Sequence, residues 1–297
     1  MVNLKEGDVI RQGKHQNSKN DSNLDIASFF GDFIIGTGHY VLLPKATTLL
    51  RRLDNILETI LAQNIGFEEV ILPKMAPVET FQKAGILGRW DSYLLSVTPY
   101  STTQGISEQY ILDPLQCTAF YQYHAGKSID VSEKPLLWYD HSGPTYRNEN
   151  VPRLRAGIRQ REFHRAEFMY LGSPEQVTAT RKKCLSALEN LCDDLKLQYR
   201  IVVGAGCYEC NPEENSSNDI IPILDLEIFC PTESKNQWLE VAGCSILETT
   251  VTSRFSIKNS NNESVWSGCV GIGLERFVYA LLSTHGTDKK YWPKQLQ

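Results

Sequence analysis

Tyr146-Arg-Asn-Glu149 is followed by a basic, proline-broken run from Asn150 to Arg155 and then by Gly157-Ile-Arg-Gln-Arg-Glu-Phe-His-Arg-Ala-Glu-Phe168. The pattern predicts a strand, a loop and a second strand, in the form of a hairpin that closes over an anionic ligand. Arg147 and Glu149 are two residues apart, so they share one face of the first strand.

The second strand of this hairpin places Arg161, Phe163, Arg165 and Glu167 on one face by the same count. A guanidinium matches a phosphate bidentately, and a phenylalanine flanked by arginines can stack on a purine. The hairpin therefore suits a nucleotide. A solvated amphipathic hairpin whose charges pair with one another has the same pattern, so both interpretations stay open at this point.

The chain has 297 residues and a formal net charge of -5. This length allows a sizeable core, and the charge gives no global basic field that would indicate duplex nucleic acid. The first thirty residues lack an apolar signal core, and no run of about eighteen apolar residues occurs. We therefore expect a soluble, cytoplasmic protein without membrane contact, in which the eight cysteines are thiols.

Hydrophobic periodicity predicts an α+β domain. Residues 44–63 carry leucine and isoleucine at 3.6-residue spacing, which predicts an amphipathic helix, and residues 67–73 read as an edge strand that ends in proline. Ser173 is predicted to cap a second long helix. Further strands are expected over residues 199–203, 223–229 and 237–241 and from Trp266. We expect residues 1–40 to form an N-terminal arm and residues 41–297 a single catalytic domain.

Three carboxylates fall on strands that otherwise bury apolar residues. Asp225 and Glu227 share one strand face, and Glu240 stands between apolar residues on the next strand. Such carboxylates need cations or hydrogen bonds to be tolerated, and a divalent metal bound with a nucleotide would supply them. A solvated sheet face is the alternative.

The glycine-rich segment Gly268 to Gly273 is predicted to run as a strand into an apolar helix with Arg276 in its first turn. Glycines let a backbone approach a ligand closely. An arginine at a helix start is badly placed unless it faces an anion. The segment therefore predicts a second basic group at an anion site.

The positions of the cysteines alone do not establish a thiolate or a zinc site. Cys117 is expected in the first turn of a helix, where the helix dipole would favour a thiolate, although a buried core cysteine is the alternative. Cys207 and Cys210 have zinc spacing, but a structural zinc site needs a second pair nearby and the sequence has none. We expect no metal at Cys207 and Cys210.

In this order, the three segments resemble the signature motifs of class II aminoacyl-tRNA synthetases. Residues 44–73 resemble motif 1, residues 146–168 motif 2 and residues 271–276 motif 3. The resemblance implies a class II synthetase-like catalytic domain, a mainly antiparallel sheet flanked by helices, and a homodimer paired through motif 1.

Within the class, the chain is similar to atypical zinc-dependent seryl enzymes and to their relatives, the amino acid:[carrier protein] ligases. This similarity implies a zinc site at Cys117, Glu167 and Cys269, with an open position for the amino group of the substrate. A crowded site of this kind suits a small amino acid such as glycine, alanine or serine. Glu167 and Ser245 would then contact or shape the place of the amino acid.

The resemblance also implies the roles of the ATP-binding residues. Arg147 would hold the α-phosphate, and Arg276 would hold the γ-phosphate from the opposite side. Glu149 would read the adenine amino group while Phe163 stacks on the ring. Arg159 belongs to the same ATP site, and Glu227 with Glu240 would bind magnesium.

The acceptor is predicted from chain length. Seryl-tRNA synthetases carry a large N-terminal tRNA-binding domain, and here only about forty residues precede the motif 1 helix. We therefore expect an ATP-dependent ligase that forms an aminoacyl-adenylate and passes the aminoacyl group to the phosphopantetheine thiol of a small carrier protein, with tRNA an unlikely partner. A zinc-dependent seryl-type core that charges tRNA is one alternative, and a catalytically dead paralogue used as a binding or regulatory module is the other.

Overall fold

The computed structural model describes residues 4–15, 24–98, 109–205, 221–233 and 237–297. Its centre is a nine-stranded sheet in the order β1-β12-β13-β14-β16-β11-β9-β4, with β10 paired to β11. All of these pairings are antiparallel except that of β4 with β9. The strands are β1 (Val9–Gln12), β4 (Glu68–Glu69), β9 (Leu136–Asp140), β10 (Pro144–Tyr146), β11 (Glu162–Gly172), β12 (Tyr199–Val203), β13 (Leu224–Phe229), β14 (Trp238–Glu248) and β16 (Trp266–Gly273).

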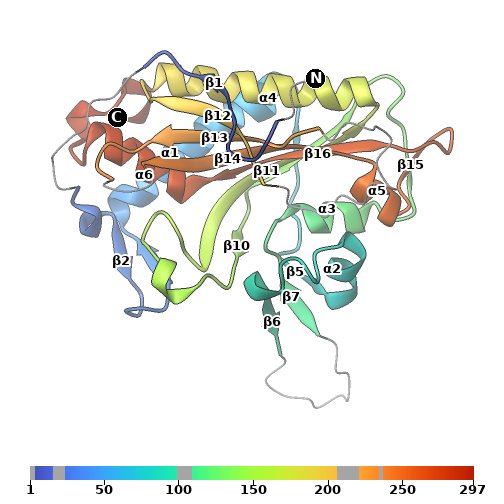
Figure 1. The fold of residues 1–297 in the computed structure, drawn as a ribbon, viewed down its shortest axis with the longest axis horizontal. Helices are drawn as coiled ribbons and strands as arrows, with labels where there is room; N and C mark the ends of the chain where they lie inside the picture. The colour runs from blue at the N-terminus through green and yellow to red at the C-terminus, as the bar shows by residue number, and fades with distance from the viewer. Residues whose placement is uncertain (1–3, 16–23, 99–108, 206–220, 234–236) are drawn as a thin grey trace.

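Helices lie on both faces of this sheet, which confirms the predicted α+β class with a mainly antiparallel sheet flanked by helices. The helices are α1 (Pro44–Leu57), α2 (Val78–Ala84), α3 (Cys117–Tyr123), α4 (Pro174–Asp194), α5 (Thr250–Arg254) and α6 (Leu274–His285). Small sheets pair β2 (Phe30–Asp32) with β3 (Tyr40–Leu42), β8 (Ser128–Ile129) with β15 (Lys258–Asn259), and β7 (Tyr110–Leu112) with both β5 (Met75–Pro77) and β6 (Leu95–Val97). Figure 1 shows α4 lying along the sheet, with α2 and β5 to β7 grouped at the opposite side of the view.

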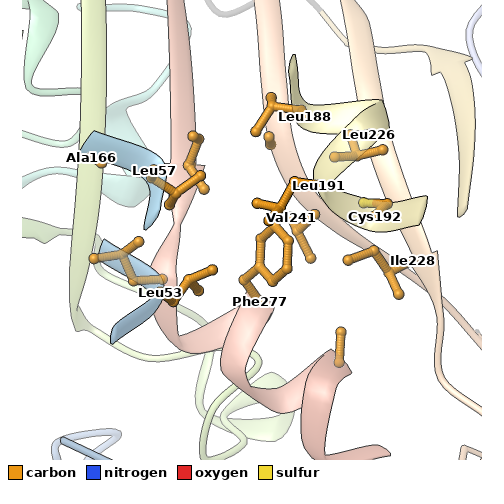
Figure 2. Close-up of a cluster of buried hydrophobic side chains, with 14 of the residues drawn as sticks. Leu53, Leu57, Ala166, Leu188, Leu191, Cys192, Leu226, Ile228, Val241 and Phe277 are labelled. Carbon is orange, nitrogen blue, oxygen red and sulfur yellow. The ribbon is translucent and has the colours of Figure 1, made fainter. Parts of the chain in front are cut away.

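The larger core lies between the sheet and helices α1, α4 and α6. Its side chains come from alternate residues of the strands, as the two-residue period of a strand requires. Figure 2 shows part of this core, in which Leu53 and Leu57 of α1, Leu188, Leu191 and Cys192 of α4 and Phe277 of α6 gather with Ala166, Leu226, Ile228 and Val241 of the strands.

The second core packs α2, α3 and α5 on the other face of the sheet. In β11, Ala166, Phe168 and Tyr170 belong to the first core, whereas Met169 and Leu171 belong to the second. The odd-numbered residues of β11 that precede Met169 therefore face the same side as the second core. This side carries the candidate site.

The helix predicted over residues 44–63 is confirmed, as α1 continues into π-helical turns over Glu58–Gln63. The strand predicted over residues 67–73 lies at the sheet edge, as expected, but it is shorter. After Glu69, one more amide, that of Val70, donates to the backbone of Tyr139, whereas that of Leu72 donates to the side chain of Asp140 (3.0 Å). Proline at position 73 has no amide to extend the ladder.

The cap predicted at Ser173 and the strands predicted over residues 199–203 and 223–229 agree with the structure, whereas the strand predicted over residues 237–241 continues to Glu248. Ser173 caps α4 in a reciprocal capping box with Gln176. Within the part assigned to an N-terminal arm, β1 pairs with β12 as an edge strand of the main sheet, and Phe29 is buried in the larger core. The division at residue 40 stays a prediction. None of the helices in the described ranges combines the length and apolarity that crossing a bilayer requires.

His141 ties the two parts of motif 1 together. Its Nδ1 lies 3.0 Å from both carboxylate oxygens of Asp54 on α1, and its Nε2 lies 3.2 Å from Oε1 of Glu69 on β4. Hydrogen bonding to Asp54 raises the pKa of His141 to about 9, although burial opposes this shift. The imidazolium therefore stabilises the contact between α1 and the sheet edge.

The contribution of His141 to stability is expected to depend on pH. Because the folded-state pKa is raised, the stabilisation is complete below about pH 6.5 and is lost as pH rises through about 9. Asp54→Asn should lower the free energy of unfolding by about 1 to 2 kcal/mol at pH 6 and by much less at pH 9.5. Urea denaturation at the two pH values measures this difference.

Asp288→Asn is the control for this experiment, because Asp288 pairs with Lys290 on an exposed surface. Its effect should be small at both pH values. An Asp54→Asn effect of equal size at pH 6 and pH 9.5 would contradict the role given to the imidazolium.

Candidate active site

One pocket on the open face of the sheet is lined by residues from motif 2, motif 3 and β14. It brings together eight of the predicted site residues, namely Arg147, Glu149, Arg159, Phe163, Glu240, Ser245, Cys269 and Arg276. Glu227 lines an adjoining pocket that also contacts Arg159, Glu240 and Arg276. Cys117 and Glu167 are buried next to Cys269. The roles assigned to these residues stay predictions.

The hairpin of β10 and β11 positions Arg147. The register pairs Thr145 with Phe163, and the amide of Arg147 adds one more bond to the carbonyl of Arg161 (2.9 Å). The first strand ends at Tyr146 rather than at Glu149, so Arg147 and Glu149 reach the pocket from a loop.

Two aromatic rings hold the guanidinium of Arg147. Its Cζ lies 5.3 Å from the ring centre of Phe163 and 5.1 Å from that of Trp90, and its Nε donates to the carbonyl of Pro114 (3.1 Å). Stacking on aromatic faces restricts the orientation of a guanidinium, and Arg147 lines the pocket in this orientation. Trp90 was not predicted, because it lies in a segment without a clear period.

Glu149 and Arg159 form an ion pair within the pocket. The Nη1 of Arg159 lies 2.8 Å from Oε2 of Glu149, whose side chain is almost completely buried. A buried carboxylate with one arginine partner is oriented by it. The pair thus connects the start of the loop to its end.

Motif 3 is locked to motif 2 by Glu275. Its carboxylate accepts hydrogen bonds from the amide of His164 (2.9 Å) and from Nδ1 of the same residue (2.7 Å). The hydrogen bond to Glu275 raises the pKa of His164, against the opposing effect of burial. This contact fixes the first turn of α6, from which Arg276 extends into the pocket.

The predicted acidic group is compact. Glu227 and Glu240 are cross-strand partners next to a bulge, and each has an arginine partner: Nε of Arg200 lies 2.6 Å from Glu227, and Nη1 of Arg276 lies 3.3 Å from Glu240. Burial and the charges of Glu240 and Glu227 raise the pKa of Asp225 to about 8. The Asp225 carboxyl therefore favours its protonated form at neutral pH.

Cys117, Glu167 and Cys269 form a buried group whose ligand atoms all lie within 4.8 Å of one another. Cys117 is the first residue of α3, as predicted. Burial raises the pKa of Glu167, while Arg165, with Nε 2.6 Å from Oε2, acts in the opposite direction. Two sulfurs and a carboxylate at this separation are a donor set of the kind that binds zinc.

Arg165 lines the pocket, and although its place on the hairpin face was predicted, no role was predicted for it. Its guanidinium covers Gly271, where an added Cβ would lie 1.8 Å from Nη2. A side chain at position 271 would displace this guanidinium from its place. Cys207 and Cys210 fall outside the described residues.

Loss of one thiol should remove the metal. Cys269→Ala is expected to reduce bound zinc from about one equivalent to near zero, because two ligands bind zinc far more weakly than three. Elemental analysis of the purified protein measures the zinc content. Cys192→Ala, which removes a buried thiol from α4, should keep its zinc, and equal zinc content in both variants would place the ion elsewhere.

Comparison with known proteins finds relatives over nearly the whole chain. It is 28% identical over 286 residues to the type-2 serine–tRNA ligase of Methanocaldococcus jannaschii, covering 86% of this chain and 54% of that protein. It is 28% identical over 294 residues to the type-2 serine–tRNA ligase of Methanococcoides burtonii, covering 88% and 57%. The chain thus spans about half the length of these relatives.

Solved structures confirm the predicted class II synthetase-like fold. The seryl-tRNA synthetase of M. kandleri, solved in complex with A. aeolicus tRNASec, superposes with a TM-score of 0.88 over 99% of this chain and 63% of that chain, at 22% identity. The prolyl-tRNA synthetase of Giardia lamblia, solved with prolyl-adenylate, gives 0.73 over 92% and 53%, at 19% identity.

These relatives correct the predicted acceptor. We expected a carrier protein as the partner and tRNA as an unlikely one, and this prediction is wrong: the curated relatives are tRNA ligases, and one structural neighbour is bound to a tRNA. The error came from chain length and net charge, which describe the chain as a whole and not the ligands of its site.

The family described as the class II core domain of tRNA synthetases (G, H, P, S and T) matches residues 100–285. This match covers well over half of the chain and includes motif 2, motif 3 and the three residues of the candidate metal site. The chain belongs to the class II tRNA synthetase core family.

Proposed function

We propose that this chain activates serine, or another small amino acid, with ATP and passes the aminoacyl group to the 3′ end of a tRNA or tRNA-like acceptor. The observation that carries the proposal is the pocket in which Arg147 and Arg276 converge beside the group of Cys117, Glu167 and Cys269. An anion and an amino group could be bound there side by side. The tRNA ligase relatives support the reaction class and the choice of serine.

In the first step, a carboxylate oxygen of the amino acid attacks the α-phosphorus of ATP. A bond forms between this oxygen and the α-phosphorus, and the bond from the α-phosphorus to the bridging oxygen of the leaving pyrophosphate breaks. Such a step depends on holding the two anions in line and neutralising their charge. Arg147 would hold the α-phosphate, and Arg276 the far end of the triphosphate.

The adenine would lie against Phe163, with Glu149 and Arg159 at its edge. Both Phe163 and Glu149 line the pocket, and Glu149 is already oriented by Arg159. Magnesium arriving with ATP would be held by Glu227 and Glu240, whose acidic neighbourhood attracts a cation.

Zinc, when bound by Cys117, Glu167 and Cys269, would supply a Lewis acid for the free amino group of the substrate. Ser245 pairs with Cys269 across the β14–β16 ladder and lines the same pocket. We therefore place the small side chain of the amino acid near Ser245.

In the second step, a terminal hydroxyl of the acceptor attacks the carbonyl carbon of the adenylate, and AMP leaves.

A catalytically dead paralogue would be expected to lose the charged groups of the first step. Arg147, Arg276 and the carboxylates are all present, which favours a working enzyme.

Amino-acid-dependent exchange of pyrophosphate into ATP tests the first step with serine, glycine and alanine. Arg147→Ala should reduce this exchange at least about a hundredfold, because it removes charge stabilisation of the transferring phosphate. Arg11→Ala removes an arginine that pairs with Glu189, away from the pocket, and should retain exchange. Absence of exchange with all three amino acids would contradict the proposed activation step.

Charging of total tRNA with labelled amino acid tests the second step. Formation of acid-precipitable aminoacyl-tRNA is expected with the amino acid that supports exchange. Exchange without charging, together with transfer to the thiol of a holo-carrier protein supplied in parallel, would overturn the tRNA acceptor while leaving the activation step intact.

A further inference from the structure

The loop between β10 and β11 is pinned to the body of the protein by Arg155. Its Nη1 and Nη2 lie 2.6 and 2.5 Å from the two carboxylate oxygens of Glu233, which follows β13. The Nη2 also donates to the hydroxyl of Tyr279 on α6 (2.8 Å), and that hydroxyl in turn donates to Glu233. One guanidinium therefore joins three segments that are far apart in the sequence.

Arg155, Glu233 and Tyr279 form a closed network of hydrogen bonds. The side chain of Glu233 is 10% exposed and Tyr279 is 2% exposed, whereas the side chain of Arg155 is 52% exposed. The guanidinium of Arg155 also lies 5.5 Å from the ring centre of Tyr279. A bidentate pair with a largely buried carboxylate is oriented more firmly than a surface ion pair. Hydrogen bonds from Arg155 and Tyr279 lower the pKa of Glu233 even though burial opposes this.

Arg155 begins the turn that carries part of the ATP pocket. Its amide donates to the carbonyl of Arg159 (2.9 Å), and its carbonyl accepts from the amides of Ile158 (3.1 Å) and Arg159 (2.8 Å). The turn passes through Gly157, whose φ of +73° suits glycine, and the position of its missing Cβ is 3.2 Å from Tyr279.

The same turn is hydrogen-bonded to motif 3. The Nε of Arg276 donates to the carbonyl of Ile158 (2.8 Å). Arg159, at the end of the turn, is the partner of Glu149. Movement of this turn would therefore displace Arg159, Glu149 and Arg276 together, which are three of the groups proposed for ATP. In Figure 1 the loop between β10 and β11 lies beside β10, below the main sheet.

We propose that Glu233 and Tyr279 are positioning residues for ATP, which act by holding Arg155 and so fixing the turn from Arg155 to Arg159. This proposal rests on the proposed function for its kinetic consequence, but not for the restraint on the loop. The network acts on the nucleotide through the turn and leaves the amino acid site, at Cys117, Glu167 and Cys269, unchanged.

Trypsin cleavage of the native full-length protein tests the restraint without reference to activity. Arg153 and Arg155 in the loop are cleavage sites, and cutting needs local opening of the loop. Glu233→Gln and Tyr279→Phe keep the shape of both side chains, and each should speed cleavage after Arg153 by about three- to tenfold. Mass spectrometry identifies the cut.

Glu189→Gln is the matched control, because it removes the partner of Arg11 on the edge strand β1 and leaves the network of Arg155 intact. Its loop should be cut at the wild-type rate. Wild-type rates in both Glu233→Gln and Tyr279→Phe would overturn the proposal. Circular dichroism melting of each variant separates loop opening from global unfolding.

Pyrophosphate exchange tests the consequence for ATP. Glu233→Gln should raise the KM for ATP about tenfold while the KM for the amino acid and the zinc content stay at wild-type values. Arg155→Lys, which keeps the charge but not the bidentate geometry, should fall between wild type and Arg155→Ala. Equal increases in both KM values would indicate a structural role and overturn the positioning role.

A double-mutant cycle shows whether the residues act as a unit. Arg155→Ala and Glu233→Gln together should raise the KM for ATP no more than the larger of the single changes. Full multiplication of the two effects would contradict the network. If the wild-type protein catalyses no exchange at all, the proposed function fails, whereas the trypsin result alone still decides whether Glu233 and Tyr279 restrain the loop.

Discussion

The antiparallel ladder between β11 and β16 is the interaction on which the rest of the site depends. It runs over eight residue pairs, from Arg165 with Gly273 to Gly172 with Trp266. This register pairs Glu167 with Gly271, so that Cys269 is the diagonal neighbour of Glu167 and Gly271 is that of Arg165. A shift of one residue would turn every side chain of β11 to the other face. Gly271 thus matters for the space that it leaves to the guanidinium of Arg165.

Much of the fold followed from local patterns in the sequence. The leucines of residues 44–63 and the capping box at Ser173 predict helices, because the signal lies within a few turns of the chain. The short form of β4 was not predictable, since it results from Asp140, which lies about seventy residues later and takes the amide of Leu72. Periodicity carries no information about such a distant competitor for a backbone group.

The candidate site was predictable only in part. Arg147, Glu149 and Phe163 stand out by alternation on a hairpin, and Arg276 by its place after the glycines. Cys117, Glu167 and Cys269 are separated by 50 and 102 residues, so no spacing rule unites them, and the prediction came from resemblance. Trp90 and the network around Arg155 had no signal, because their partners meet only in the folded chain.

The division of β11 between two faces has an implication for how such a protein can change over time. Ala166, Phe168 and Tyr170 are constrained by packing, whereas Phe163, Arg165 and Glu167 are constrained by what the pocket must bind. Packing therefore constrains one set of positions in this strand, and ligand binding constrains the positions between them. A descendant of this chain could acquire a different substrate by replacing Phe163, Arg165 or Glu167 without disturbing the buried layer on the reverse side.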